Sequence, residues 1–278
     1  MRTSEKPGSL GNLALTVVML PLAALVAFPF YYIVVTTLKT SEEIQSNPLG
    51  LPQSVTFANY VKVLSDPLIP VAFANTVYVT VASVALMVLV GSLAAFAITL
   101  KRTWFNRVVA VALLAGFLVP YQTTLLPLYK MIAGVGLVDT LTGLIAIYSA
   151  GAVFCYFIIV GYMRTLPPEL FEAARIDGAR PFRMYFSIAL PLVRPVLVTV
   201  GVFQVMAVWN DYVSPTIYLS SPDKTTLVLL ASRAVAQFTI DWPMFMTVTV
   251  VVLIPMLVLF LVAQKYIVSG LVAGSLKG

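Results

Sequence analysis

Few residues of this chain could carry out chemistry by themselves. The sequence contains no histidine, and Cys155 is its one cysteine, which excludes histidine acid–base catalysis, histidine metal sites and a disulfide within the chain. A serine protease would need a Gly-x-Ser-x-Gly turn, which is missing, and an aspartyl protease of the membrane would need a second acid beside Asp211. We therefore expect no catalytic residue, no metal site and no enzymatic activity.

ATP hydrolysis by this chain is also not expected. The phosphates of ATP are commonly held by a Gly-x-x-x-x-Gly-Lys-Ser/Thr loop, and the sequence contains none. If the protein works against a concentration gradient, ATP and Mg²⁺ must be bound by a partner. We therefore predict that the chain itself binds no cofactor.

The residues best suited to an interaction lie in one charged stretch, "ELFEAARIDGARPFRMYFSIALPL", at positions 169–192. Thr165 is a candidate N-cap, and Glu169 would lie near the positive end of the helix dipole. These residues predict a helix from about Pro168 to Asp177, which ends because Gly178 can adopt a left-handed backbone conformation.

A second helix is expected to open at Pro181, since proline is favoured in a first helical turn. Apolar residues recur at helical spacing i, i+3, i+4 and i+7, and these positions are Phe182, Tyr185, Phe186 and Ala189. The stretch is therefore predicted to form a helix, a glycine turn and a second helix.

The residue types and their spacing alone allow two interpretations of this hairpin. An amphipathic hairpin could lie in the membrane interface and merely join two spans. Docking of a partner is the alternative, because Ala173 and Ala174 would allow another surface to approach closely. Fixed charges of both signs would surround them, namely Glu172, Arg175, Asp177 and Arg180.

The elements that would position this hairpin are membrane spans. The chain has 278 residues, of which 60% are hydrophobic and 10% charged, and a crossing of the bilayer requires roughly 20 apolar residues. Six stretches satisfy this requirement, at about 13–35, 73–100, 108–129, 141–163, 195–218 and 246–264. We therefore predict an all-α membrane protein with six transmembrane helices in a single domain over residues 1–278.

The distribution of basic residues predicts the orientation. With six spans both termini lie on one side, and that side takes twelve Lys and Arg residues while the other takes five. Positive residues accumulate on the cytoplasmic side, so both termini, the loop 164–194 and the tail 265–278 are predicted to be cytoplasmic. The net charge of +6 then reflects topology, and no nucleic acid partner is expected.

Asp211 is the one acid inside the predicted spans. It lies 17 residues after Arg194, about 25 Å along a straight helix, near the external end. Trp209, Asn210 and Asp211 could line the external part of a translocation path. Alternatively, Trp209, Asp211 and Tyr212 could form an interfacial belt that anchors the helix and bonds to neighbouring spans. Gln204 has the same two interpretations, a path residue or a hydrogen bond between helices.

The hairpin carries a family resemblance. Its pattern is Glu-Ala-Ala, then a glycine after three residues, then Ile-x-Leu-Pro after nine more, and it is similar to the signature loop of permease subunits in binding-protein-dependent ABC importers. The matching residues are Glu172, Ala173, Ala174, Gly178, Ile188, Leu190 and Pro191. Two further segments, "LKTSEEIQSNPLGLPQSVTFANYVKVL" and "AVWNDYVSPTIYL", resemble carbohydrate importers.

The resemblance implies the type I importer permease fold and a set of partners. These would be a second, unlike permease subunit, two cytoplasmic ABC ATPase subunits, a sugar-binding protein outside the membrane, and lipid. The first helix of the hairpin would be the coupling helix, in contact with the ATPase. The residues implied in coupling are Glu172, Ala173, Ala174, Arg175, Asp177, Gly178, Ile188 and Pro191.

Further regions are interpreted by the same resemblance. The ending "QKYIVSGLVAGSLKG" is similar to the tail of maltose-type permeases, and residues 269–278 would insert between the ATPase subunits. The external segment 220–242 is predicted to be structured and to contact the binding protein. The implied location is the plasma membrane of a bacterium or archaeon.

Alternatives concern the solute and the energy source. Similar permeases carry oligosaccharides, monosaccharides or glycerol phosphate, so the sequence does not identify the substrate. A secondary transporter is the alternative from another class, but such carriers keep several ionisable groups in the membrane. Here Asp211 is the one such group, which favours the ATP-driven importer.

Overall fold

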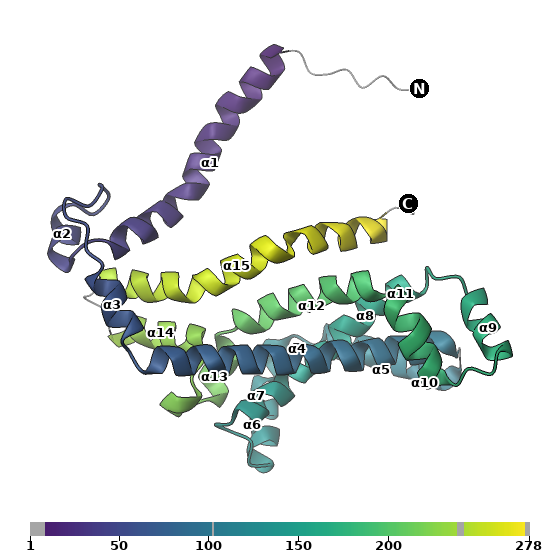
Figure 1. The fold of residues 1–278 in the computed structure, drawn as a ribbon. Coiled ribbons are helices and arrows are strands. Elements are labelled where there is room, and N and C mark those ends of the chain that lie inside the picture. Colours follow the sequence, from purple (N-terminus) through teal and green to yellow (C-terminus); the bar gives the residue numbers. More distant parts are fainter. Residues whose placement is uncertain (1–8, 102, 238–241, 276–278) are drawn as a thin grey trace. The chain divides into compact units, whose positions relative to one another are not determined.

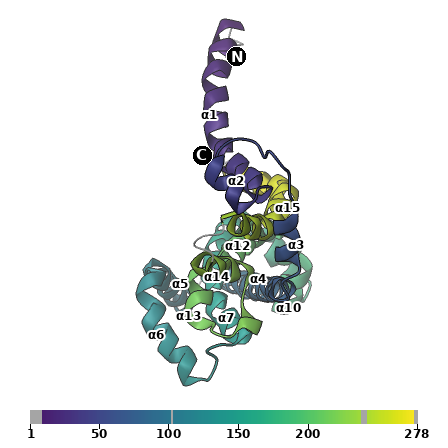
Figure 2. The same cartoon turned by 90° about the vertical axis from the view of Figure 1, so that its left-hand side faces the viewer.

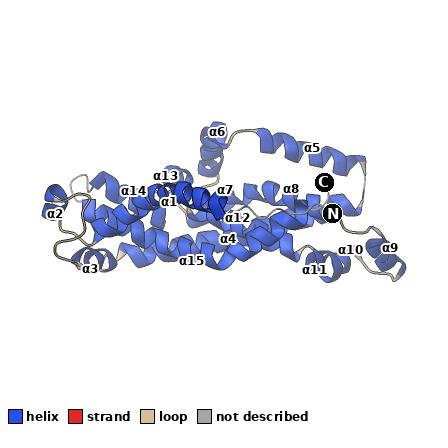
Figure 3. Ribbon diagram, turned by 90° about the horizontal axis from the view of Figure 1, so that it is seen from above, coloured by secondary structure: helices blue, strands red, loops and turns tan. Residues whose placement is uncertain are grey.

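The computed structural model of the protein describes residues 9–101, 103–237 and 242–275, with side chains for 15–101, 103–233 and 242–264. All regular elements in these ranges are helical, as Figure 3 shows. The chain divides into two compact units. One comprises the residues up to Asp66 together with Arg233–Leu253, and the other comprises Pro67–Ser232 together with the residues from Ile254 onward.

The first unit contains α1 (Ser9–Thr37), α2 (Ser41–Ser46) and α3 (Ala58–Leu64). Lys39 follows α1 and is fully buried, with its ammonium group donating a hydrogen bond to the Asn47 carbonyl at 2.6 Å. The Asn59 side chain donates to the carbonyls of Thr37 and Lys39, both at 2.9 Å. The segment after α1 is therefore folded back on the end of that helix.

The second unit is built around α4 (Leu68–Leu100), which packs against α8 (Ala152–Met163) and α12 (Arg194–Trp209). Gly91 permits a close approach, since a Cβ atom there would lie 2.6 Å from the Cys155 Cβ and 2.8 Å from the Ala152 carbonyl oxygen. Ala95, one turn further, is fully buried. Small residues at this spacing allow membrane helices to pack by van der Waals contact.

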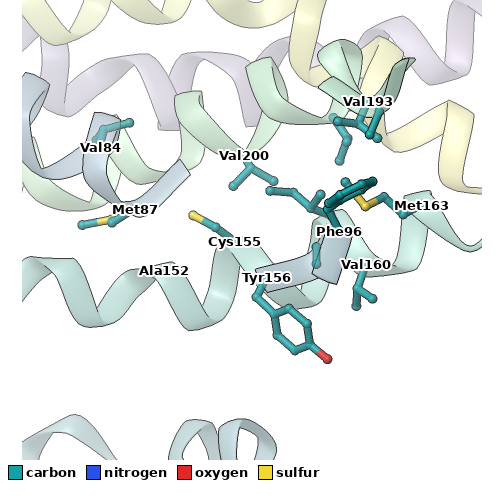
Figure 4. Close-up of a cluster of buried hydrophobic side chains, with 14 of the residues drawn as sticks. Val84, Met87, Phe96, Ala152, Cys155, Tyr156, Val160, Met163, Val193 and Val200 are labelled. Carbon is teal, nitrogen blue, oxygen red and sulfur yellow. The ribbon is translucent and has the colours of Figure 1, made fainter. Parts of the chain in front are cut away.

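The core of this unit is a continuous apolar cluster contributed by α4, α8 and α12. Figure 4 shows part of it, with Met87 from α4, Cys155 from α8 and Val200 from α12 around one interior region. Cys155 is fully buried and is a small packing residue of this cluster. The core thus fixes the three helices whose ends carry the candidate sites.

Four of the described helical stretches are long and apolar enough to cross a membrane: Leu15–Thr37, Leu68–Leu100, Leu141–Met163 and Trp242–Gln264. The third is composed of α7 (Leu141–Tyr148), η1 (Ser149–Gly151) and α8. The fourth belongs to α15 (Trp242–Ser275), which continues through Pro255. These stretches contain or largely overlap four of the six predicted spans.

The other two predicted spans are not straight helices. In the region 108–129, α5 (Trp104–Leu118) ends before Pro120, and α6 (Tyr121–Gly134) departs at 104°. Proline cannot supply the backbone N–H that would continue the helix. In the region 195–218, α12 ends at Trp209, and a separate α13 (Val213–Tyr218) follows. Six spans result if each of two bent helix pairs counts as one, namely α5 with α6, and the stretch Pro181–Leu192 with α12, which meet at 77°.

Two segments near the C-terminus bear on the sequence predictions. The segment 220–242, which was predicted to be external, is structured in its described part, with η3 (Pro222–Lys224) and α14 (Leu227–Gln237), while 238–241 lie outside the described residues. The predicted tail 265–278 is not separate from the last span, because α15 continues to Ser275. Residues 276–278 of the predicted insertion segment lie outside the described residues.

Candidate functional site

The charged hairpin begins with α9 (Glu169–Ile176), which lies at one end of the second unit beside α10, as Figures 1 and 3 show. The prediction of Thr165 as its N-cap is wrong. Pro168 occupies that position without a side-chain hydrogen bond, and the Thr165 hydroxyl donates to the Tyr162 carbonyl at 2.8 Å. A threonine hydroxyl near the end of α8 can bond back to a carbonyl of its own helix, and Thr165 makes this bond instead of capping α9.

The C-terminus of α9 is a Schellman motif, as the glycine predicted. Gly178 has a φ of +75°. Its N–H donates to the Arg175 carbonyl at 3.0 Å, and the Ala179 N–H donates to the Ala174 carbonyl at 2.9 Å. No atom lies within 4 Å of where a Cβ of Gly178 would be, so the backbone conformation, and not crowding, requires glycine here.

One face of α9 is open to a partner. Glu172, Ala173 and Asp177 are exposed, and the apolar side chain of Ile176 is 86% exposed. Ala174 differs, because only 7% of its surface is exposed and it packs in the apolar cluster of the protein itself. The expectation that a partner's surface approaches both alanines is therefore wrong for Ala174, which the protein itself covers, and stays a prediction for the exposed Ala173.

Arg175 is bonded within the protein. Its guanidinium group donates to the carbonyl of Leu100, the last residue of α4, at 2.9 Å. The last carbonyls of a helix have no partner within that helix, so this bond satisfies one of them. Arg175 thus fastens α9 to the end of the central helix, a role that the resemblance did not indicate.

The second arm of the hairpin is α10 (Pro181–Met184), a π-helical turn η2 (Tyr185–Ala189) and α11 (Leu190–Leu192). Tyr185 and Ala189 are buried, and the Tyr185 hydroxyl lies 2.7 Å from that of Ser92 on α4. Phe182 and Phe186 are exposed, so only half of the predicted apolar stripe faces the core. The extra residue of a π-turn rotates the positions that follow it.

The remaining residues implied in coupling lie further along this arm. Ile188 is half-buried and packs against the apolar cluster, and Pro191 is exposed at the start of α11. The hairpin thus combines residues that face outward with residues that hold it to α4.

A second candidate site is a cleft of about 440 Å³ between the helices of the second unit. Its polar lining comes from Tyr121, Thr124, Tyr148, Gln204, Asn210, Asp211 and Ser214, and its apolar lining includes Met87 and Leu128. The cleft therefore combines aromatic faces with uncharged hydrogen-bonding groups and one carboxylate.

Asp211 occupies the break between α12 and α13. Its carboxylate accepts a hydrogen bond from the Tyr148 hydroxyl at 2.8 Å, from the Val213 N–H at 2.9 Å and from the Ser214 N–H at 3.3 Å. The prediction that it lies on a continuous helix is wrong, because α12 has already ended. The acid instead fixes the first turn of α13 and orients Tyr148 in the cleft.

The other predicted path residues differ in position. Gln204 lines the cleft and also donates to the Gly151 carbonyl at 3.0 Å, so it forms the hydrogen bond between helices that was one of its two interpretations. Asn210 lines the cleft and donates to the Met206 carbonyl at 2.9 Å. The Trp209 ring packs against Phe73 with centroids 6.2 Å apart, and Trp209 is not among the lining residues.

Comparison with known proteins identifies the family. The family described as the binding-protein-dependent transport system inner membrane component matches residues 87–272. This chain belongs to that family. The matched region contains the whole hairpin and all lining residues of the cleft, so both candidate sites lie in the part of the permease that defines the family.

Two relatives are similar over nearly the whole permease. A melibiose/raffinose/stachyose import permease of Bacillus subtilis is 32% identical, over 92% of this chain and 95% of that protein. A diacetylchitobiose uptake system permease of Streptomyces coelicolor is 30% identical, over 92% of this chain and 85% of that protein.

The fold is also found in a solved structure. A chain of a bacterial ABC transporter for import of the polysaccharide alginate matches with a TM-score of 0.83 and 21% identity, over 96% of this chain and 99% of that one. The all-helical importer permease fold is thereby confirmed, and the protein is a multi-pass component of the inner membrane.

Four polar residues of the permease cleft were missed by sequence reasoning: Tyr121, Thr124, Tyr148 and Ser214. Each lies in an apolar stretch, so the sequence pattern assigned it only to a membrane span. The available signal was a hydroxyl-bearing side chain beside a helix break, namely Pro120 before Tyr121 and the turn after Tyr148. No cluster of three acids or cysteines that could hold a metal occurs among the described residues.

Proposed function

We propose that this permease is one of two unlike membrane subunits of an ATP-driven importer for a sugar or oligosaccharide. Its partners would be the second permease, two cytoplasmic ABC ATPase subunits that bind ATP and Mg²⁺, and an external sugar-binding protein. The chain itself would catalyse no reaction. The observation that carries the proposal is the hairpin, whose α9 presents an exposed face and is fastened to α4 by Arg175.

The hairpin suits the transmission of movement. A partner that displaces α9 would act through Arg175 on the last turn of α4, and through Tyr185 and Ser92 on its interior. Since α4 is 33 residues long, about 50 Å, it reaches from the hairpin to the cleft, where Met87 is a lining residue. Closure of the ATPase subunits on ATP would thus open the cleft outward, and hydrolysis would reset it.

The cleft supports a neutral sugar as the substrate. Tyr121 and Tyr148 offer ring faces, and Gln204 and Asn210 offer amide groups for hydroxyls. No basic side chain lines the described cleft, and Asp211 contributes a negative charge. A phosphate ester would meet repulsion there without a counter-ion, so glycerol phosphate is the less favoured alternative. The relatives whose names specify oligosaccharides support the same class.

The orientation belongs to this proposal. We place α9, both termini and the tail from residue 265 onward in the cytoplasm of a bacterium or archaeon, with residues 269–278 directed to the ATPase subunits. The segment 220–242 would lie outside and contact the sugar-binding protein. The exposed apolar surface of the spans would face lipid and the second permease.

The test is the variant Glu172→Lys in the assembled importer. Glu172 is exposed on α9, so reversal of its charge should disturb docking without disturbing the fold. Uptake and ATP hydrolysis stimulated by the binding protein should fall at least tenfold, while the amount of permease in the membrane stays unchanged. Glu42→Lys, an exposed acid far from the hairpin in sequence, is the control.

Two results would contradict the proposal. Normal uptake by Glu172→Lys would remove the hairpin from the mechanism. Concentration of a solute by the chain alone in liposomes, without an ATPase, would favour a secondary transporter instead.

A further inference from the structure

The helices α7 and α13 form an antiparallel pair that is closed by hydrogen bonds at both ends. They pack against one another in the second unit and are both visible in Figure 2. The last residue of α7, Tyr148, bonds Asp211, which lies two residues before α13. Asp139 lies two residues before α7 and bonds Ser220 and Ser221, which follow the C-cap residue of α13.

The end at Asp139 is bonded through both backbone and side chain. The Asp139 N–H donates to the Tyr218 carbonyl at 2.8 Å. One carboxylate oxygen accepts from the N–H groups of Ser220 at 2.9 Å and Ser221 at 3.0 Å, and the other accepts from the Ser221 hydroxyl. Lys224 lies 3.7 Å away. Four hydrogen bonds thus fix the chain where it leaves α13.

The segment that follows is also held to α4. The Asn75 side chain donates to the carbonyls of Asp223 and Thr225, both at 2.9 Å, and the Leu227 N–H donates to the Thr76 hydroxyl at 2.9 Å. The start of the external segment is therefore an ordered extension of α13. A force on it would reach α13 through Asp139.

The opposite end of the pair lies in the cleft. Asp211 and Tyr148 both line it, and the Val213 and Ser214 N–H groups donate to Asp211. The six residues of α13 span only about 9 Å. About one and a half helical turns thus separate the Asp139 end of the pair from the Asp211 carboxylate in the cleft.

We propose that Asp139 is a positioning residue that links the external segment mechanically to the cleft. A protein that docks on this segment would thereby change the position of the Asp211 carboxylate in the cleft. This inference rests on the proposed function for the identity of the docking protein. Its structural part, a mechanical link between the two ends of α13, stands independently of any substrate.

The backbone at Asp139 determines which variants are informative. Its φ is +58°, in the left-handed region where alanine would be strained. Asp139→Gly removes the carboxylate and tolerates this conformation. Asp139→Asn also tolerates it and keeps an oxygen that can accept from the N–H groups of Ser220 and Ser221. It loses the charge and the acceptor for the Ser221 hydroxyl.

Amide hydrogen exchange of the full chain in detergent tests the link. In Asp139→Gly, exchange should be at least tenfold faster both at 219–221, where the carboxylate holds Ser220 and Ser221 directly, and at Val213 and Ser214, which bond Asp211. Asp139→Asn should stay close to the wild type. Glu42→Gln, which removes an exposed charge elsewhere, should change neither region.

Faster exchange at 219–221 alone would overturn the proposal, because Asp139 would then be only a local tether. The reciprocal variant Tyr148→Phe provides a second check. It should accelerate exchange at 219–221 as well as at Val213 and Ser214, and protection of 219–221 equal to the wild type would count against the link.

The functional arm uses the assembled importer. Asp139→Gly should reduce the stimulation of ATP hydrolysis by the loaded binding protein at least fivefold, with unchanged basal hydrolysis, and Asp139→Asn should restore it. Full stimulation in Asp139→Gly would refute the role in transport. If the binding protein does not stimulate ATP hydrolysis by the wild-type importer, the proposed function is refuted instead. The hydrogen-exchange result would remain valid in that case.

Discussion

Gly178 ends α9 in a left-handed conformation, and open space surrounds it. A side chain there meets no neighbour, so the cost of substitution is conformational, about 1–2 kcal/mol for a residue with a Cβ and less for asparagine. Proline is a different case, because its φ is fixed near −65° and it lacks the N–H that bonds Arg175. The orientation of α10 relative to α9 depends on this one residue.

We predict that Gly178→Pro abolishes uptake while the protein is still inserted in the membrane, and that Gly178→Asn retains most uptake. Proline would redirect the chain after α9, whereas asparagine accepts the left-handed conformation. Uptake assays with immunoblots of isolated membranes measure both quantities. Wild-type uptake by the proline variant would show that the angle of the hairpin does not matter.

The hydrogen bonds of the single residue Asp139 should make the stability of the fold depend on pH. The Ser221 hydroxyl and the N–H groups of Ser221 and Ser220 stabilise its charged form and hold its pKa well below the usual value near 4. The unfolded chain then binds more protons than the folded one as the pH falls. Stabilisation by Asp139 is therefore complete above about pH 4 and is lost progressively below it.

The difference in Tm between the wild type and Asp139→Asn should accordingly be constant from pH 7 to about pH 4.5 and shrink at lower pH. Thermal unfolding of the detergent-solubilised protein at a series of pH values measures it. A difference that grows on acidification would contradict the assignment of the hydrogen bonds to the charged carboxylate.

At the scale of elements, the contact between α4 and α8 holds the second unit together. Apolar burial stabilises helix association little in lipid, so close packing of small residues has to do so. Gly91 brings the α4 backbone onto α8, where a methyl group would lie 2.6–3.0 Å from Cys155, Ala152 and Tyr156. Two of these three contacts are to backbone atoms, which cannot move aside as the end of a side chain can.

We predict that Gly91→Ala lowers the stability by about 1–3 kcal/mol, the usual cost of overpacking. Gly161→Ala is the matched control on α8, since no atom lies within 4 Å of its added Cβ, and alanine favours a helix more than glycine does. Thermal unfolding in detergent compares the two variants. Equal Tm values would argue against the close approach of the helices.

At the scale of the whole molecule, the distribution of charge and the helix boundaries lead to an orientation. The hairpin and both termini are assigned to the side that holds twelve of the 17 basic residues. The segment between α1 and α4 is assigned to the other side. Each assignment can be tested with a single exposed position.

In a Cys155→Ser background, Ile176→Cys should react with a membrane-impermeant maleimide only after the cytoplasmic side is opened. Leu51→Cys should react in intact cells, because Leu51 is 70% exposed. The pattern follows from the positive-inside rule. Labelling of Ile176→Cys from outside would reverse the topology and remove the ATPase from its proposed contact.

The sequence by itself determined the features that depend on local physics. The lengths of the apolar runs indicate membrane spans, and the ends of α9 follow from Pro168 and Gly178, whose backbone conformations are restricted or permissive in themselves. The spacing of the Glu-Ala-Ala motif was sufficient to indicate the family, which the comparison confirms. None of these inferences needed to know which residues meet in space.

The tertiary structure alone decided which partner each residue has. Arg175 meets Leu100, Tyr148 meets Asp211 and Asp139 meets Ser221, across 75, 63 and 82 residues of sequence. Helical periodicity shows which residues share one face of a helix, but it does not specify the neighbouring element on which that face packs. The break at Pro120 likewise turns one predicted straight span into a bent pair. The end of α12 at Trp209 brings Asp211 to Tyr148 in the cleft.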